Sequence, residues 1–285
     1  MTTPLNLLVA FPYMKPDVVE QIRKLRHARI LVDSGAFTAW KAGKSVDLDE
    51  YCRFIEALGD LPWRYFMLDV VGDPAATMKN YEIMLKRGFN PIPIFTRGED
   101  PSVLEDYYKT SDVVGVGGLV GTRGNRGFVK GIMEKVGKRK VHWLGFSSRP
   151  FIQYYKPYMC DSSSWLSSMR YGSLIIVGPR LSEVRVKRTD FDKIPSKEVF
   201  DLFRWYEEDI RKMTIRKEWS NSGVGDLCLE KIAAKSAVRR VIDIESIYGT
   251  KFFLAVVCVW QVRLMSWGHD FWNGIKRDHA SSPHA

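Results

Sequence analysis

The sequence predicts an α/β protein with a (β/α)8 barrel of the TIM type, followed by additional C-terminal helices. Eight short apolar runs bounded by turn residues recur along the first two-thirds of the chain, with helical patterns between most of them. The chain has 285 residues, a length at which α/β barrels form one domain. We therefore expect a single domain over residues 1–285, with the barrel strands within about 5–178 and a helical part at about 196–278.

The apolar runs give the expected strands in chain order. Strands that alternate with single helices form parallel units, and eight units favour a closed barrel over an open sheet, which would have to extend too far. The expected strands are residues 7–10, 30–32, 65–68, 92–95, 113–116, 141–144, 158–160 and 174–177.

Capping residues mark the helices between these strands. Asp73-Pro74 and Asp100-Pro101 each place a capping acid before a proline at the first helical position, and Gly88 ends the first of these helices. Asp47 caps an apolar stripe within residues 51–58, at spacings of three and four. The periodicity changes in the last third of the chain, where long amphipathic helices are expected.

These later helices are expected at residues 196–217 and 226–247. The tryptophan-rich segment 251–276 suits either a helix or a strand. No linker long enough to separate a second domain is present in the sequence.

Composition excludes several classes of protein. The longest wholly apolar run, residues 252–260, is too short to cross a bilayer, and the first ten residues lack the features of a signal peptide. The four cysteines are scattered without a CxxC pair, so neither a disulfide framework nor a zinc site is predicted. We expect a cytoplasmic protein with buried thiols, no metal, no cofactor and no membrane partner.

The formal net charge of +10 is unevenly distributed. Residues 113–285 carry 29 Lys and Arg against 17 Asp and Glu, whereas residues 1–112 carry 14 against 16. The basic part is where a polyanion is expected to bind. The alternative is that this charge serves only solubility.

Three of the expected strands are followed directly by an aspartate: Asp33, Asp69 and Asp161. The active site of a βα barrel lies at the carboxyl ends of its strands, so the three acids are expected on one rim. A single strand-end aspartate is often only a helix cap or a turn former. Three together repel one another and raise at least one pKa, which supplies both an acid and a nucleophile near neutral pH.

Loops on the same rim contribute small residues and cations. Gly117 and Gly118 follow the fifth strand and allow a planar ligand to approach backbone N–H groups, or they form only a tight turn. Four arginines fall in loops after strands, where they contact a phosphate backbone or face solvent without a ligand. They are Arg97, Arg123, Arg126 and Arg149.

The segment Asp33-Ser34-Gly35-Ala36-Phe37 resembles the Asp-Ser-Gly-Gly-aromatic motif of the tRNA-guanine transglycosylases. These enzymes exchange guanine for a 7-deazaguanine base. Further segments match the family in the same order, and together the matches span about residues 30–165. They are Phe66-Met67-Leu68-Asp69, Val116-Gly117-Gly118-Leu119, and His142-Trp143-Leu144-Gly145 followed by Asp161.

The sequence departs from that family in two places. It cannot build the family's zinc site, and the Gln that contacts the base in the family is missing near residues 95–98. The short, zinc-free pattern, with Ser162-Ser163-Ser164-Trp165 after Asp161, is more similar to the phage and bacterial deazapurine DNA transglycosylases. DNA is therefore the expected partner and tRNA the alternative, with an incoming base such as 7-cyano-7-deazaguanine.

The resemblance implies a role for each acid. Asp161 would attack the sugar C1′ and hold a covalent glycosyl intermediate, while Asp33 would protonate the departing purine and deprotonate the incoming one. Asp69 would accept hydrogen bonds from the N–H groups of the guanine edge. The resemblance also implies base contacts, with Phe37 and Leu144 on the two faces of the ring unless they are core residues. The implied contact residues are Phe37, Gly117, Gly118, Leu119, Leu144 and Gly145.

Two alternatives come from other functional classes. A non-catalytic nucleic-acid-binding barrel subunit has no use for three neighbouring acids, which are costly to bury. A barrel glycoside hydrolase explains two carboxylates, but it explains neither the Gly117-Gly118 pair nor the basic C-terminal part.

Overall fold

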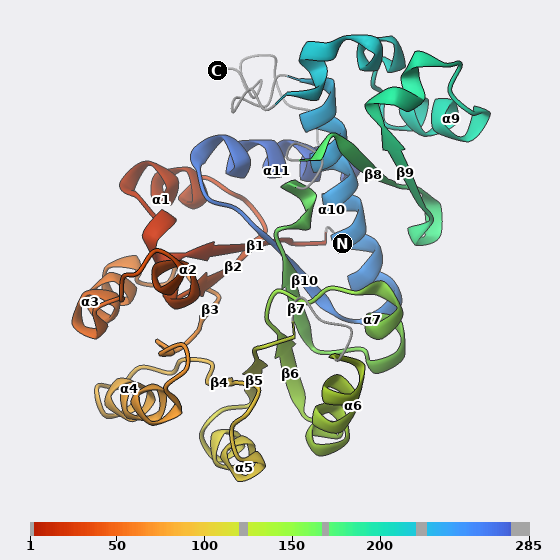
Figure 1. Ribbon diagram of the computed structural model, residues 1–285. Helices are drawn as coiled ribbons and strands as arrows, with labels where there is room; N and C mark the ends of the chain where they lie inside the picture. The colour runs from red at the N-terminus through yellow and green to blue at the C-terminus, as the bar shows by residue number, and fades with distance from the viewer. Residues whose placement is uncertain (1–2, 120–124, 167–170, 221–226, 275–285) are drawn as a thin grey trace.

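The computed structural model describes residues 3–119, 125–166, 171–220 and 227–274 (Figure 1). Its centre is a curled sheet in the order β3-β2-β1-β10-β7-β6-β5-β4, in which every neighbouring pair is parallel. This arrangement confirms the α/β class and is consistent with a TIM-like barrel. The strands are β1 (Leu5–Ala10), β2 (Ala28–Asp33), β3 (Arg64–Tyr65), β4 (Ile94–Phe95), β5 (Val113–Val116), β6 (Lys140–Trp143), β7 (Met159–Ser162) and β10 (Lys251–Ala255).

The segments at the two edges of this sheet also pair with each other. Phe66, just after β3, forms a parallel bridge with Ile92, just before β4. The Met67 N–H donates to the Ile92 carbonyl at 3.0 Å, and the Ile92 N–H donates to the Tyr65 carbonyl at 2.8 Å. Contacts of this kind between the two edge strands of a sheet are what closure of a barrel requires.

Helices connect the strands and lie around the outside of the curled sheet (Figure 1). The caps predicted at Asp47, Asp73 and Asp100 are confirmed, since each side chain accepts a hydrogen bond from a backbone N–H of the first turn. The α-helices and the short 3-10 helices (η) of this part of the chain are η1 (Phe11–Tyr13), α1 (Pro16–Arg23), α2 (Ala36–Lys41), α3 (Leu48–Leu58), α4 (Pro74–Lys86), α5 (Pro101–Thr110), α6 (Asn125–Val136), α7 (Arg149–Tyr155) and η2 (Ser164–Leu166).

The last strand of the main sheet differs from the predicted one. The apolar run 174–177 belongs to β8 (Ser173–Val177), which pairs antiparallel with β9 (Glu183–Lys187) in a separate two-stranded sheet. The place between β7 and β1 is taken by β10. The prediction that the barrel strands lie within about 5–178 is therefore wrong. An apolar run specifies a buried segment, but it does not specify which strand becomes its partner.

The C-terminal part builds a second, smaller apolar core from β8, β9 and the helices after them, in which the Phe191 ring packs against Phe203 and Trp219. The predicted helix 196–217 is divided into one α-helix and two short 3-10 helices. Among the described helices, none has the length and apolarity needed to cross a membrane. The elements are η3 (Pro179–Leu181), η4 (Arg188–Asp192), α9 (Lys197–Trp205), η5 (Ile210–Thr214), η6 (Arg216–Trp219), α10 (Cys228–Tyr248) and α11 (Val259–Trp272).

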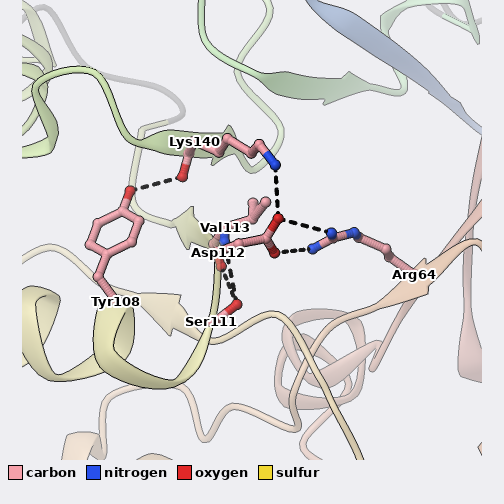
Figure 2. Close-up of polar contacts among 6 residues, drawn as sticks. All are labelled: Arg64, Tyr108, Ser111, Asp112, Val113 and Lys140. Carbon is pink, nitrogen blue, oxygen red and sulfur yellow. Dashed lines mark hydrogen bonds and ion pairs between the residues drawn. The ribbon is translucent and has the colours of Figure 1, made fainter.

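At the amino ends of the strands, Asp112 links β3 to β6 (Figure 2). Its carboxylate accepts hydrogen bonds from Arg64 at 2.7 and 3.1 Å and from Lys140 at 2.9 Å. These contacts lower the pKa of Asp112 to about 2, and the hydrogen bond from Arg64 is the largest cause. Lys140 therefore lies on the face opposite the strand ends that carry the predicted site.

We expect Asp112→Asn to lower the free energy of unfolding by about 1 kcal/mol at pH 7, because solvent screens this half-exposed cluster. Since the folded-state pKa of Asp112 lies below its ordinary value of 3.8, this stabilisation is present above about pH 4 and is lost as the pH falls toward 2. Urea unfolding at pH 7 and pH 3 measures the difference. Asp106→Asn, which breaks an exposed pair with Lys109 within α5, is the control and should cost less.

Candidate active site

The three strand-end aspartates lie at the carboxyl ends of their strands, as predicted. Asp33 is the last residue of β2, Asp69 follows β3, and Asp161 lies near the end of β7. Burial is the largest cause that raises the pKa of Asp33 to about 7, and the charges of Asp69 and Asp161 add to it. The structure therefore brings these carboxyl groups into one electrostatic cluster.

The local sequence explains how two of these acids are held. The Gly35 N–H donates to Asp33 Oδ2 at 3.1 Å, and the Ser34 hydroxyl donates to Asp69 Oδ1 at 3.2 Å. Gly35 has a φ of +74°, and a Cβ there would lie 2.4 Å from Pro12 Cδ. Both the turn and the close approach of η1 therefore require glycine at this position.

Asp161 is buried and held on one oxygen. Its Oδ1 is 2.9 Å from His142 Nε2 and accepts a hydrogen bond of 2.9 Å from the Gly145 N–H. Its Oδ2 accepts no hydrogen bond from the residues that the structure describes. Oδ1 is thus fixed by hydrogen bonds, whereas Oδ2 keeps its lone pairs unused by the described residues. A carboxylate that acts as a nucleophile needs one oxygen in that condition.

His142 orients Asp161 through a single ring nitrogen. The side chain is fully buried on β6, with its ring packed edge-on against Phe66 at 4.9 Å between centroids. Its Nδ1 is buried without a hydrogen-bond partner in the described part of the chain. A proton on Nδ1 would have no acceptor, so we place the proton on Nε2, where Asp161 accepts it.

No role was predicted for His142, although it belongs to a matched segment. The sequence signal for His142 is a polar side chain inside the predicted apolar strand 141–144. Side chains alternate between the two faces of a strand, so such a residue can point into the barrel, toward the strand-end acids. Glu99, in the loop after β4, was missed as well. It accepts a hydrogen bond from the Thr96 N–H, and burial together with the charge of Asp69 raises its pKa. The sequence signal for Glu99 is an acidic residue a few positions beyond the end of a strand, whereas the three aspartates were sought directly after a strand.

Two of the glycines predicted to contact a base use their N–H groups elsewhere. The Gly117 N–H donates to the Phe95 carbonyl at 2.9 Å, and the Gly145 N–H donates to Asp161. Neither N–H is open to a ligand in this structure. Sheet pairing and the buried acid thus already use these two N–H groups, and contact of Gly117 and Gly145 with a base stays a prediction.

Gly118 and Leu119, which follow Gly117 in the loop after β5, pack closely against their surroundings. Gly118 has a φ of +71°, and a Cβ there would lie 2.8 Å from Arg97 Cβ, so the backbone passes close to the loop after β4. Leu119 is buried in the main core. Gly118 therefore allows the close approach to the loop after β4, and the Leu119 side chain contributes to packing, while their contacts with a base stay predictions.

Leu144 and Phe37 lie in different surroundings. A Cβ on Gly115 would lie 2.9 Å from Leu144 Cδ1 and 3.2 Å from Phe66 Cε1, so Leu144 packs on the same side of the sheet as His142. Phe37 is 54% exposed on α2, where its ring stacks on Trp40. Leu144 thus packs inside the sheet near His142, whereas Phe37 lies exposed on α2, and their contacts with a base stay predictions.

Three of the four predicted arginines are in the described part of the chain, and Arg123 lies outside it. Arg97 and Arg126 are exposed at the carboxyl side of their strands, and the Arg97 guanidinium lies 5.5 Å from the centre of the Phe128 ring. Arg149 is half-buried and donates to the Leu181 carbonyl. It therefore ties α7 to η3, which uses part of its hydrogen-bonding capacity.

In the described ranges, no group of three or more His, Cys, Asp or Glu side chains is placed to hold a metal ion. None of the protein-family models and none of the curated proteins compared with the sequence matches it.

Proposed function

We propose that this protein is a DNA-guanine transglycosylase, built on a closed (β/α)8 barrel, that exchanges guanine in DNA for a 7-deazaguanine base. The observation that supports this most directly is the contrast between two acids of one cluster. Asp33 has a pKa raised to about 7, whereas Asp161 is held by two hydrogen bonds on one oxygen. Such a contrast lets one carboxyl act as acid and base while the other acts as nucleophile.

In the first step Asp161 Oδ2 attacks the sugar C1′ and the bond from C1′ to the guanine nitrogen breaks. The electron pair goes to guanine, which takes the proton of Asp33, and an ester joins Asp161 to C1′. In the second step the Asp33 carboxylate removes a proton from the incoming base. That base attacks C1′, and Asp161 leaves as a carboxylate, so the configuration at C1′ is retained.

A duplex hides the reacting atoms, so the target nucleotide must be single-stranded or flipped out of the helix. Asp69 would then accept hydrogen bonds from the guanine N–H groups, with Leu144 against one face of the ring and the Gly118 backbone near its edge. Exposed Arg97 and Arg126 would contact phosphates.

Asp69→Asn is expected to raise the KM for guanine by about tenfold or more, with a smaller change in kcat, since a hydrogen bond to a charged acceptor contributes about 1.5–3 kcal/mol. Steady-state incorporation at varied guanine concentration measures this split. Ser34→Ala is the matched control, because it removes only the hydroxyl that donates to Asp69 and should change KM by a few-fold. A kcat and a KM both within twofold of wild type would contradict the role of Asp69.

His142→Leu is expected to slow formation of the covalent intermediate by about 10- to 100-fold without raising KM, because the donor that orients Asp161 is lost. His142→Gln keeps a donor and should recover most of the rate. Single-turnover formation of the protein–DNA adduct measures both variants, and thermal unfolding checks that both remain folded. Equal losses in the two variants would mean that His142 contributes packing alone.

The direct test incubates the protein with labelled guanine and, in separate reactions, with single-stranded DNA, duplex DNA and tRNA. Label in DNA, together with an adduct that survives denaturation, is the expected result. Label in tRNA alone would show that RNA is the substrate. Binding without an adduct to any of these nucleic acids would favour a non-catalytic subunit.

A further inference from the structure

Helix α2 carries an exposed aromatic pair beside the candidate active site. Phe37 and Trp40 are each 54% exposed, and their rings stack at 5.9 Å between centroids with 25° between the planes. The two residues are three apart on the helix, while Ala36 is buried. Exposure of two large rings forgoes the burial that normally stabilises such side chains. A paired, solvent-facing aromatic surface is therefore evidence for a ligand.

The surroundings of this pair are basic. The Lys41 Nζ lies 4.4 Å from the centre of the Phe37 ring, and Lys44 is exposed in the turn that follows α2. The segment 34–46 contains no Asp or Glu. Proteins that bind single-stranded nucleic acid combine rings on which bases stack with cations that pair with phosphates. The charge and the rings of this surface therefore complement such a strand.

The position of α2 ties this surface to the reacting acids. The helix begins at Ala36, directly after the turn that holds Asp33, and its six residues span about 9 Å. A strand whose target base lies beside Asp33 can therefore bring its neighbouring nucleotide over α2.

We propose that Trp40, stacked on Phe37 and flanked by Lys41, binds the nucleotide next to the exchanged guanine in single-stranded DNA. Trp40 supplies a face on which the neighbouring base stacks, and Lys41 supplies a charge for the adjoining phosphate. This proposal rests on the proposed function, because it takes the target base to lie at Asp33. It adds a reason for a single-stranded substrate, since bases within a duplex cannot stack on a protein side chain.

The experiment measures binding of a short fluorescent single-stranded oligodeoxynucleotide with one guanine, in an Asp161→Asn background in which exchange is expected to be strongly reduced. Trp40→Ala should raise the Kd by about tenfold, because stacking of one base on an aromatic ring contributes about 1–3 kcal/mol. Trp40→Phe should stay within about threefold of the parent. Lys41→Gln should reduce the slope of log Kd against log salt by about 0.7.

Phe200→Ala is the matched control, because Phe200 is 52% exposed on α9, which packs on the second core. A Trp40→Ala variant that binds within twofold of the parent, or that loses no more affinity than Phe200→Ala, overturns the proposal. A parent that sediments as a dimer which Trp40→Ala dissociates also overturns it, since a second copy of the chain would then cover the pair.

Failure of the surface and failure of the proposed function give different results. If wild-type protein exchanges guanine but Trp40→Ala binds like the parent, the surface is wrong and the function stands. If wild-type protein exchanges no base but binding depends on Trp40, then Trp40 binds single-stranded DNA, while the proposed function and the place of an exchanged guanine beside Trp40 are wrong.

Discussion

Asp161→Asn is expected to lower the rate of base exchange by at least about 10³-fold while leaving DNA binding within about threefold of wild type. The amide is a poor nucleophile, so the ester to C1′ cannot form. Its size matches the carboxyl group, and its oxygen can still accept hydrogen bonds from His142 and Gly145. The variant therefore isolates the chemical step from the structure of the site.

The measurement combines incorporation of labelled guanine with a search for a denaturation-resistant protein–DNA adduct. Asp73→Asn is the matched control, because Asp73 caps α4 without a part in the site and should leave exchange unchanged. A residual exchange rate within tenfold of wild type would show that Asp161 is not the nucleophile.

Asp33→Asn is expected to slow both guanine departure and base arrival by about 10²-fold or more, since one carboxyl group serves both proton transfers. In the wild-type protein, guanine release should fall as the pH rises through about 7, because the protonated form of Asp33 is then lost. The variant should lose this pH dependence. Single-turnover release of guanine between pH 5.5 and 8.5 measures it, and a variant that keeps the wild-type profile would assign the acid to another residue.

The same substitution has an expected effect on stability that does not depend on catalysis. The pKa of Asp33 is raised above its ordinary value of 3.8, so between about pH 4 and pH 7 the folded state holds a proton that the unfolded state releases. Stability of the wild-type protein therefore falls as the pH rises through this window. Above pH 7 the Asn variant should be more stable by at most about 4 kcal/mol, and by less if water screens the side chain.

Thermal unfolding at pH 4 and pH 8 tests this sign. The Asn variant should unfold at a higher temperature than wild type at pH 8 and at a similar temperature at pH 4. A variant that is less stable than wild type at pH 8 would mean that burial of the ionised Asp33 side chain does not destabilise the folded state.

Features encoded by short segments could be predicted from the sequence. The caps at Asp47, Asp73 and Asp100 depend on a side chain and a backbone N–H two or three residues away, and all three form as expected. The strand-end acids were predicted for the same reason, because an apolar run followed by Asp fixes both the strand and the end that carries the acid. Their gathering on one rim follows from parallel pairing of the strands.

The tertiary structure decided what depends on partners distant in the chain. It placed β10 rather than β8 between β7 and β1, since strand pairing is chosen by the packing of the whole core and not by an apolar run. It likewise gave the Gly117 N–H to Phe95 and the Gly145 N–H to Asp161, and it set His142 beside that acid. A sequence shows which groups can donate or accept a hydrogen bond, whereas the folded chain determines which of them meet.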